Sequence, residues 1–210
     1  MIKEMNRKKI INIADFKLGN LRSVEKAFQS LGFEARISPD PADIAGASHL
    51  VLPGDGAFGK SMQHIRELGF EKPVRDFIAS GRPFLGICVG FQLLFDTSEE
   101  MGDHQGLGLL PGKVVKFPAG RKIPHMGWNQ LRWTRPSPLN EGVPDGAFCY
   151  FVHSYYAVPG DSRDTLGLTE YGLEFASVME RGNMFAVQFH PEKSQEAGLR
   201  MLKNFAELQG

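Results

Sequence analysis

The sequence is poor in cysteine and tryptophan, with two of each among its 210 residues. Two cysteines, Cys88 and Cys149, cannot build the disulfide framework on which small secreted domains rely. This favours a reducing, cytoplasmic setting in which a cysteine is either core filler or a working thiol. The chain also lacks net charge, because 24 basic residues match 24 acidic ones. That balance argues against a broad basic face, so we expect neither a nucleic-acid nor a membrane partner.

Long hydrophobic runs are also absent. The longest apolar stretch, residues 84–95, contains Gln92 and is much shorter than the roughly 20 residues of a membrane-spanning helix. The basic start is followed by a short apolar run that stops at Asp15, too soon for the core of a signal peptide. We therefore expect a solvated leader over residues 1–9 and one folded domain over residues 10–208. No Cys/His cluster has metal-ligand spacing, so we expect neither a metal nor a cofactor.

Segments typical of strands and of helices alternate in the first half of the chain. Over residues 21–31, apolar side chains recur three and four positions apart, as on one face of a helix, and Gly32 ends the pattern. The expected strands are 10–14, 33–37, 49–52 and 84–87, and the expected helices are 21–31, 61–68, 72–80 and 89–95. Strands separated by helices predict an α/β domain with a mostly parallel central sheet flanked by helices.

The pattern changes after residue 105, where short strand candidates are joined by Gly/Pro turns. These candidates are 113–117, 129–133, 148–153, 175–180 and 184–188. One helical pattern follows, over residues 195–208. We expect mixed or antiparallel strands in this half to complete the same sheet, which the final helix then closes.

The segment Gly86-Ile87-Cys88-Val89-Gly90 has the pattern of a nucleophile elbow. It follows an expected strand and opens an expected helix, and its two glycines allow the tight reversal that this turn needs. A helix N-terminus there favours a thiolate, and the Val89 N–H points toward a developing oxyanion. A buried structural cysteine is the alternative, and it is our interpretation of Cys149, which lies in mid-strand.

Among the six histidines, His190 is the candidate base for Cys88. Pro191 biases His190 toward an extended backbone, in which residues two apart project to the same side. Glu192 can then lie beside the imidazole and hold its tautomer. A strand-end histidine next to a turn is the alternative reading of this pair.

The segment Gly54-Asp55-Gly56 directly follows the expected strand 49–52. Glycines on both sides of Asp55 give a backbone that can turn an N–H group toward a ligand. We interpret this segment as the second donor of an oxyanion hole. A plain Gly/Pro turn is the alternative.

The strings at residues 86–94 and 189–194 resemble those of class I (triad) glutamine amidotransferases, and the resemblance covers about residues 10–208. Four more strings, at 19–24, 52–59, 124–129 and 150–155, are similar to those of a narrower family. Its members are the glutaminase subunits of imidazole glycerol phosphate synthases in histidine biosynthesis. Two positions depart from the pattern: Lys17 stands where the first loop usually has glycine, and Asp55 stands where valine is frequent.

The resemblance implies a flavodoxin-like fold and a cofactor-free reaction. Cys88 attacks the side-chain amide of L-glutamine to form a glutamyl thioester, His190 relays protons and Glu192 orients the imidazole. Val89 and Asp55 supply the oxyanion hole. The released ammonia passes to a (β/α)8-barrel cyclase subunit, with which the chain forms a heterodimer that converts PRFAR into imidazole glycerol phosphate and AICAR.

The resemblance also implies two groups of binding residues. Those that hold glutamine are Gly54, Gly56, Gln92, Glu100, Ser154 and Tyr155. Those that face the partner are Asn20, His125, Met126, Trp128, Asn129 and Tyr150, with a packing role for His125 equally open.

Two other functions stay open from the residues alone. One is a glutaminase for a different acceptor, such as a pyridoxal phosphate synthase or a sugar-amidation system. The other is a catalytically silent scaffolding subunit, against which the intact set of Cys88, His190 and Glu192 argues.

Overall fold

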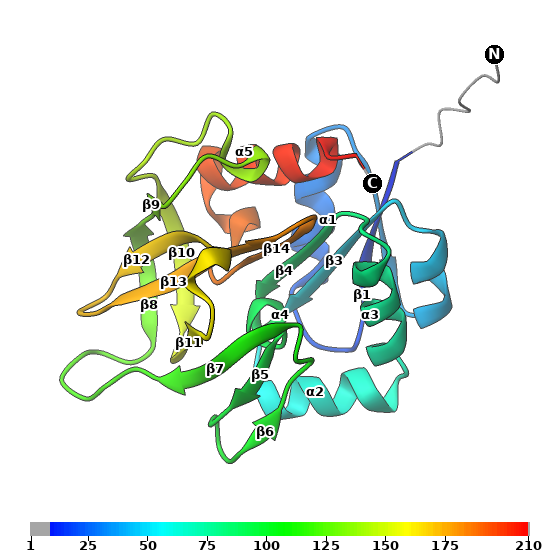
Figure 1. The fold of residues 1–210 in the computed structure, drawn as a ribbon. Coiled ribbons are helices and arrows are strands. Elements are labelled where there is room, and N and C mark those ends of the chain that lie inside the picture. Colours follow the sequence, from blue (N-terminus) through cyan, green and yellow to red (C-terminus); the bar gives the residue numbers. More distant parts are fainter. Residues whose placement is uncertain (1–8, 210) are drawn as a thin grey trace.

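A central sheet runs through the molecule, and the half built mainly from N-terminal strands is parallel (Figure 1). The structure is a computed structural model and describes residues 9–209. The parallel strands lie in the order β2-β1-β3-β4-β14. Their bounds are β1 Ile10–Ala14, β2 Glu34–Ser38, β3 His49–Gly54, β4 Phe84–Cys88 and β14 Met184–Val187. The last strand of the chain therefore lies beside the strand that ends at Cys88.

Helices flank this parallel half. Their bounds are α1 Leu21–Ser30, α2 Phe58–Glu67, α3 Glu71–Ala79, α4 Val89–Gln92 and α5 Gln195–Glu207. α1 leads from β1 outward to β2, whereas α2 and α3 lead from β3 in the opposite direction to β4. Right-handed crossovers therefore place α1 on one face of the sheet and α2 with α3 on the other. α5 packs beside α1, where Phe205 meets Phe28 with ring centroids 6.2 Å apart.

The other half of the sheet is mostly antiparallel. From β14 it continues through β13 (Glu174–Arg181), β11 (Tyr155–Pro159) and β7 (Leu110–Lys116) to β5 (Phe95–Ser98) and β6 (His104–Gln105). β12 (Thr165–Glu170) joins β13 and carries β9 (Arg132–Trp133) on its other edge. The α/β class, the mostly parallel sheet and the added antiparallel strands are confirmed.

One part of the expected sheet is separate. β8 (His125–Gln130) and β10 (Phe148–His153) pair with each other in a two-stranded antiparallel sheet. The expected strand 129–133 is thus divided between two sheets. The division falls at Leu131, which is 1% exposed and donates its N–H to the Ala147 carbonyl at 3.0 Å.

The expected helix 89–95 is wrong in length, because α4 ends at Gln92 and Phe95 begins β5. The Leu93 carbonyl accepts from the Leu107 N–H at 2.7 Å, and the Leu94 carbonyl accepts from the Leu109 N–H at 2.8 Å. Backbone from a distant segment thus takes the acceptors that further helical turns would use.

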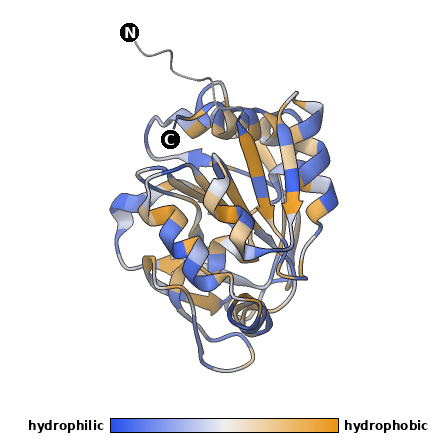
Figure 2. Ribbon diagram, turned by 90° about the vertical axis from the view of Figure 1, so that its right-hand side faces the viewer, coloured by the Kyte–Doolittle hydropathy of each residue, from blue (hydrophilic) through white to orange (hydrophobic). Residues whose placement is uncertain are grey.

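The core is dominated by phenylalanine, which supplies all of the largest fully buried side chains. Central strands such as β3, β4 and β14 are buried along their whole length, as expected for parallel strands covered on both faces. Figure 2 shows many hydrophobic residues on the strands of the sheet, while the helices carry hydrophilic residues as well.

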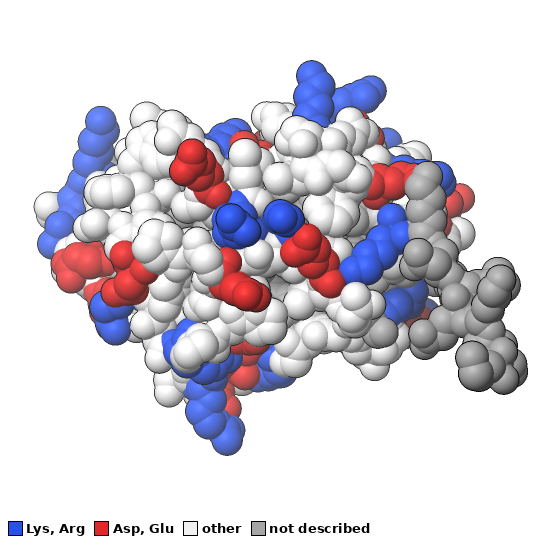
Figure 3. Space-filling model, turned by 90° about the horizontal axis from the view of Figure 1, so that it is seen from above, with Lys and Arg blue, Asp and Glu red and all other residues white. Residues whose placement is uncertain are grey.

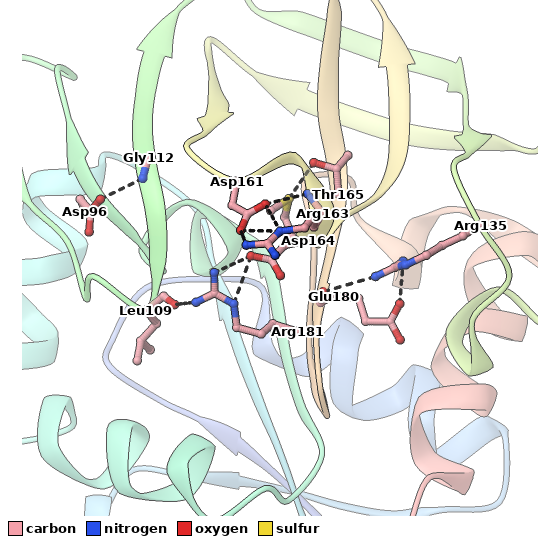
Figure 4. Close-up of polar contacts among 11 residues, drawn as sticks. Asp96, Leu109, Gly112, Arg135, Asp161, Arg163, Asp164, Thr165, Glu180 and Arg181 are labelled. Carbon is pink, nitrogen blue, oxygen red and sulfur yellow. Dashed lines mark hydrogen bonds and ion pairs between the residues drawn. The ribbon is translucent and has the colours of Figure 1, made fainter.

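Charged residues of both signs are interspersed on the face seen in Figure 3. Figure 4 shows several ion pairs around η3 (Ser162–Asp164), a short 3-10 helix beside β13. Arg181 pairs with Asp164 and donates to the Leu109 carbonyl at 2.7 Å. Arg135 pairs with Glu180 at 2.9 Å. None of these residues lines the pocket over Cys88 and His190. We therefore infer that their ion pairs and hydrogen bonds stabilise the ends of β7 and β13.

Only the last residue of the expected leader lies within the described residues, which exclude 1–8. The Lys9 ammonium donates to the carbonyls of Glu207 and Leu208, each at 2.9 Å. A cation at these carbonyls stabilises the C-terminal end of α5. Lys9 is thus half-buried against the domain rather than free in solvent.

Lys17, which stands where the family usually has glycine, has an unusual backbone conformation. Lys17 has φ 68°, the left-handed region that glycine adopts without cost. The Asp15 carboxylate accepts from the Lys17 N–H at 2.9 Å and pairs with its ammonium at 3.3 Å. The loop therefore keeps a glycine-like turn with a lysine in it.

Candidate active site

Cys88 lies at the turn between β4 and α4, with φ 56° and ψ −109°. This conformation is rare for a residue with a side chain, and it is the strained strand-to-helix turn expected from the sequence. Cys88 lies next to Gly54 in the register of β4 and β3. Asp55 and Gly56, which follow Gly54, therefore leave the sheet beside the thiol, at the carboxyl ends of parallel strands.

The two glycines of the elbow are required by close backbone packing. A Cβ on Gly90 would lie 1.8 Å from the Leu52 carbonyl oxygen of β3. A Cβ on Gly86 would lie 2.8 Å from the Gly90 carbonyl oxygen. α4 can therefore lie against β3, with Cys88 at its start, only because both positions lack a side chain.

His190 follows β14, the strand next to β4, and has an extended backbone (φ −99°, ψ 97°). Its Nδ1 lies 2.9 Å from Glu192 Oε1, and both side chains are buried. The His190 N–H donates to the Tyr150 carbonyl at 2.9 Å, which ties this segment to β10. The structure thus brings the expected base and its orienting carboxylate together at the end of the sheet where Cys88 lies.

Burial of the His190 imidazole lowers its pKa, but interactions with Cys88 and Glu192 outweigh burial and raise the pKa to about 10. Among the described residues, no oxygen or nitrogen lies within hydrogen-bond distance of the buried His190 Nε2. The imidazole is therefore held through Nδ1, while Nε2 is available for proton transfer at the sulfur.

A pocket of about 300 Å³ opens over Cys88 and His190. It is lined by five of the six residues expected to hold glutamine, namely Gly56, Gln92, Glu100, Ser154 and Tyr155. Gly54 does not line the pocket, because it packs against α4 instead. A larger groove of about 850 Å³ lies beside α5 and Trp128 but contains neither cysteine nor histidine, so the chemistry belongs to the smaller pocket.

Two of the expected glutamine-binding side chains also make contacts inside the protein. Gln92 Nε2 donates to the Tyr155 carbonyl and to Gln188 Oε1, each at 3.0 Å. Glu100 Oε2 accepts from the Phe58 N–H at 2.6 Å, where a carboxylate stabilises the start of α2. Both side chains therefore line the pocket and, through these hydrogen bonds, also hold its wall in place.

The expected oxyanion donors, Asp55 and Val89, both line the pocket. Val89 is the first residue of α4, so its N–H has no partner within the helix. Asp55 is exposed, which keeps its carboxylate in solvent. Gly56 follows with φ +93°, a conformation that only glycine adopts readily.

The pocket is lined by three further residues that were not expected as site residues, although they lie in the strings 124–129 and 150–155. They are Pro124, Val152 and His153. Beyond their place in these strings, the signal for His153 was its position directly before Ser154 and Tyr155. A strand pattern alone does not show whether such a histidine faces a pocket or a core.

The residues expected to face a partner divide between the two sides of the β8–β10 sheet. Met126 is 60% exposed and Trp128 46%, and Trp128 meets Tyr150 with ring centroids 6.0 Å apart. His125 is 3% exposed and lies on the inner side with Asn129, so burial favours its packing role. Asn20 is on a separate element, where its side chain caps α1.

Cys149 is fully buried in β10, and burial raises the pKa of its thiol to about 12. This agrees with its interpretation as a core residue. Within residues 9–209, no group of three or more His, Cys, Asp or Glu side chains could hold a metal ion. Over the same residues, no helix has both the length and the apolar character of a membrane span.

Comparison with known proteins identifies the family of this chain. The family model of class-I glutamine amidotransferases matches residues 12–208. A protein of Moorella thermoacetica named imidazole glycerol phosphate synthase subunit HisH is 52% identical, over 94% of each chain. A protein of the same name from Syntrophotalea carbinolica is 50% identical, over 95% of this chain and all of its own.

Solved structures agree at the level of the fold. A crystal structure of a glutamine amidotransferase has a TM-score of 0.74 at 21% identity, and the match covers 94% of this chain and 99% of that one. The structure of PurLQS from Thermotoga maritima has a TM-score of 0.76 at 19% identity, over 94% of this chain and 97% of the matched one. With Cys88 at its elbow and His190 beside Glu192, the chain belongs to the class-I glutamine amidotransferase family and, within it, to the HisH subunits of imidazole glycerol phosphate synthase.

Proposed function

We propose that this chain hydrolyses L-glutamine to L-glutamate and ammonia as the glutaminase subunit of imidazole glycerol phosphate synthase, in histidine biosynthesis. The observation that carries the proposal is the convergence of Cys88 and the His190–Glu192 pair on one pocket at the end of the parallel sheet. Relatives about half identical over nearly the whole chain, all named for that subunit, support the same acceptor pathway.

The chemistry follows from the positions of these groups. The Cys88 thiol gives its proton to His190 Nε2, and Sγ attacks the carbonyl carbon of the glutamine side-chain amide. The negative charge that develops on oxygen is held by the N–H groups of Val89 and Asp55. When the C–N bond breaks, His190 gives its Nε2 proton to the departing nitrogen, which leaves as ammonia.

Water then attacks the thioester carbon while His190 accepts a proton from that water. The C–S bond breaks, His190 returns the proton to the sulfur, and glutamate leaves. Glu192 keeps the imidazole in place throughout.

The exposed face of the β8–β10 sheet is the surface that we propose for a (β/α)8-barrel cyclase subunit. Met126, Trp128 and Tyr150 lie on this face, and large aromatic side chains commonly anchor interfaces. Val152 lies opposite Met126 in the β8–β10 register and also lines the pocket. The surface is therefore continuous with the place where ammonia forms. A covered passage keeps ammonia away from bulk water, in which it is largely protonated and no longer a nucleophile.

Asn20 and Asn129 belong to the same proposed interface. Asn20 starts α1 in the loop that follows β1, and it is exposed. Asn129 is half-buried on the inner side of β8 and supports this interface indirectly, because its amide donates to the Glu170 carbonyl at 2.8 Å and so holds the strand that carries Trp128. The complex is then a heterodimer that acts on glutamine and on the cyclase substrate at separate sites.

The test is the variant Cys88→Ala in the complex with the barrel subunit. It is expected to abolish glutamine-dependent synthesis and to leave ammonia-dependent synthesis at the wild-type rate, because only the source of ammonia is lost. Cys149→Ala is the matched control, since that thiol is buried outside the pocket and its loss should leave glutamine turnover intact. Glutamine consumption by the Cys88→Ala complex at the wild-type rate would contradict the assignment. Glutamine hydrolysis by the wild type with no synthesis from PRFAR would point to another acceptor.

A further inference from the structure

The inner side of the β8–β10 sheet holds a continuous chain of side-chain hydrogen bonds. Asn129 Nδ2 lies 3.2 Å from His125 Nε2, His125 Nδ1 lies 2.9 Å from His153 Nε2, and His153 Nδ1 lies 2.8 Å from the Tyr155 carbonyl. The two histidines are directly opposite each other in the strand register. This series of hydrogen bonds thus runs from Asn129 of β8 to the Tyr155 carbonyl in the wall of the pocket.

Every proton in this chain has a defined place. The Tyr155 carbonyl can only accept, so His153 Nδ1 carries the hydrogen and the Nε2 of a neutral His153 accepts. His125 must then donate from Nδ1, which leaves its Nε2 to accept from the Asn129 amide. The orientation of that amide is set independently, because Asn129 Nδ2 donates to the Glu170 carbonyl at 2.8 Å and its Oδ1 accepts from the Gln130 N–H at 2.8 Å.

Burial keeps both imidazoles neutral, as this pattern requires. It lowers the pKa of His153 to about 3, a shift that the nearby His125 and His190 reinforce and the Tyr155 carbonyl opposes. It lowers the pKa of His125 to about 4. The His125 ring is stacked between Tyr171 and Phe151, with centroids at 4.0 and 4.9 Å, so it cannot turn without disturbing both neighbours.

The Tyr155 end of this series of hydrogen bonds is part of the reaction site. The Tyr155 carbonyl accepts from Gln92 Nε2 as well as from His153, so two buried side chains fix its direction. Gln92, His153, Ser154 and Tyr155 all line the pocket that contains Cys88. The wall is also paired with β7, and the Ser154 carbonyl accepts from the Phe117 N–H at 3.2 Å. Loss of the His153 hydrogen bond therefore removes one of the two side-chain restraints on the Tyr155 carbonyl.

We propose that His125 and His153 are positioning residues of the glutaminase site, which hold the Ser154–Tyr155 wall in the conformation that binds glutamine. Neither imidazole takes part in the chemistry. His125 acts through His153, and His153 acts through the Tyr155 carbonyl. The proposal rests on the proposed function, since it names what the wall is held in place to bind.

The first test is steady-state glutamine hydrolysis by the complex with the barrel subunit. His125→Phe keeps an aromatic ring between Tyr171 and Phe151 but removes both nitrogens. We expect the KM for glutamine to rise about tenfold, the effect of one buried hydrogen bond. We expect kcat to change less than KM, because the wall contacts glutamine before and during the reaction. His125→Asn, which can place an amide N–H near the Nδ1 position, should recover most of the lost affinity.

The matched control is Phe175→Leu. Phe175 packs against both histidine rings and makes no side-chain hydrogen bond, so this variant loosens the same cluster without breaking the chain. Its KM should stay close to that of the wild type. Equal KM values in His125→Phe and Phe175→Leu would overturn the proposal, because packing alone would then account for the effect.

The second test reads the protons directly and needs no variant. In the wild-type chain at pH 7, nitrogen NMR of the imidazoles should find His125 and His153 neutral and protonated only at Nδ1. An Nε2–H tautomer, or a charged ring, at either residue would overturn the proposal. If the wild type failed to hydrolyse glutamine, the proposed function and the positioning role would both be wrong, whatever the tautomers. Wild-type hydrolysis with an unchanged KM in His125→Phe would overturn the positioning role alone.

Discussion

Cys88 combines the reactive group of the proposed mechanism with the most strained backbone position of the site. Its φ of 56° and ψ of −109° cost a side-chain-bearing residue about 1–3 kcal/mol, whereas glycine adopts such angles without this penalty. The surrounding β3 and β4 backbone nevertheless holds the turn. The strain therefore comes from the backbone angles at position 88, and any residue with a Cβ atom would experience it.

This strain leads to a prediction about stability. Cys88→Gly should be more stable than Cys88→Ala by about 1–2 kcal/mol, because glycine relieves the strain and alanine keeps it. Urea unfolding of the two inactive variants measures the difference, and comparing them removes the effect of losing the thiol. An alanine variant more stable than the glycine variant would contradict the prediction, because the strain would then be smaller than the roughly 0.5–1 kcal/mol that glycine loses through unfolded-chain entropy.

His190 and Glu192 should differ in the effect of their removal. His190→Ala takes away the group that moves protons, a contribution of about 10²–10⁴-fold in rate. Glu192→Ala takes away only the group that orients the imidazole through the 2.9 Å contact, so its loss in kcat should be smaller. Glutamate release by the complex measures both. A folded Glu192→Ala variant as inactive as His190→Ala would contradict this ranking.

Residues of the site were predictable from sequence when local patterns determine their place. Cys88 sits between paired glycines, and His190 and Glu192 are two apart in an extended segment. His125 and His153 could not be placed this way, because their inward direction depends on how β8 pairs with β10. Strand pairing sets which alternate residues are buried, and a shift of one residue would reverse them.

At the scale of elements, the contact between α4 and β3 sets the position of the elbow. Gly90→Ala would push a methyl group against the Leu52 carbonyl, at a distance of 1.8 Å before any shift. Such overpacking in a rigid interior typically costs about 1–3 kcal/mol, and here the obstacle is backbone that cannot rotate away. We expect a loss of at least about 2 kcal/mol in the free energy of unfolding.

Gly46→Ala is the control for this prediction. Gly46 lies in η1 (Pro41–Gly46), has open space around its Cβ position and is not among the residues with positive φ. Its replacement by alanine should leave the stability unchanged or slightly higher. If Gly90→Ala unfolded at the same urea concentration as Gly46→Ala, the close packing of α4 on β3 would not be required.

Elements with a strong local pattern were also predictable. The first-half strands and α1 follow from apolar periodicity and from glycine at the helix end. The missed strands β5, β6 and β11 have no such signal. β6 is two residues long, and β11 and β12 are held by antiparallel partners. β11 takes its hydrogen bonds from β7, and residues 107–109 take the carbonyls that would extend α4, so a local pattern does not contain these contacts. β12 instead forms a hairpin with β13, in which Glu170 pairs with Glu174, so its turn was a local signal that was missed.

At the scale of the whole molecule, the sheet assembles the site from segments far apart in the chain. Cys88 ends β4, and His190 follows β14, which adds to the sheet beside β4 after the antiparallel strands. The sequence predicted a strand near residues 184–188 but not its neighbour. The pairing depends on covering both faces of the sheet at once, a property of the complete fold.

Buried histidines make the stability of the protein depend on pH. Burial lowers the pKa of His49 and of His125 to about 4, and that of His153 to about 3, from 6.5 in the unfolded chain. Their contribution is complete above pH 6.5 and is lost as the pH falls toward 4, because the unfolded chain then binds protons that the folded chain does not. His190 acts in the opposite sense. Its pKa is raised to about 10, so its contribution is complete below pH 6.5 and is lost as the pH rises toward 10.

We therefore predict that the free energy of unfolding is highest at about pH 7, where the slopes of the three lowered histidines and of His190 cancel. On the acid side, each of the three imidazoles changes it by up to about 1.4 kcal/mol per pH unit. On the alkaline side, His190 alone gives a shallower decline. Urea unfolding at pH 5, 6.5 and 8 measures both slopes. The slope of the unfolding free energy against urea concentration should be the same at all three pH values, which checks that the same folded and unfolded states are compared. His49→Gln removes one of the three groups and should make the acid slope shallower by about a third. A free energy of unfolding that does not change between pH 5 and 6.5 would mean that these histidines are not held neutral by the fold.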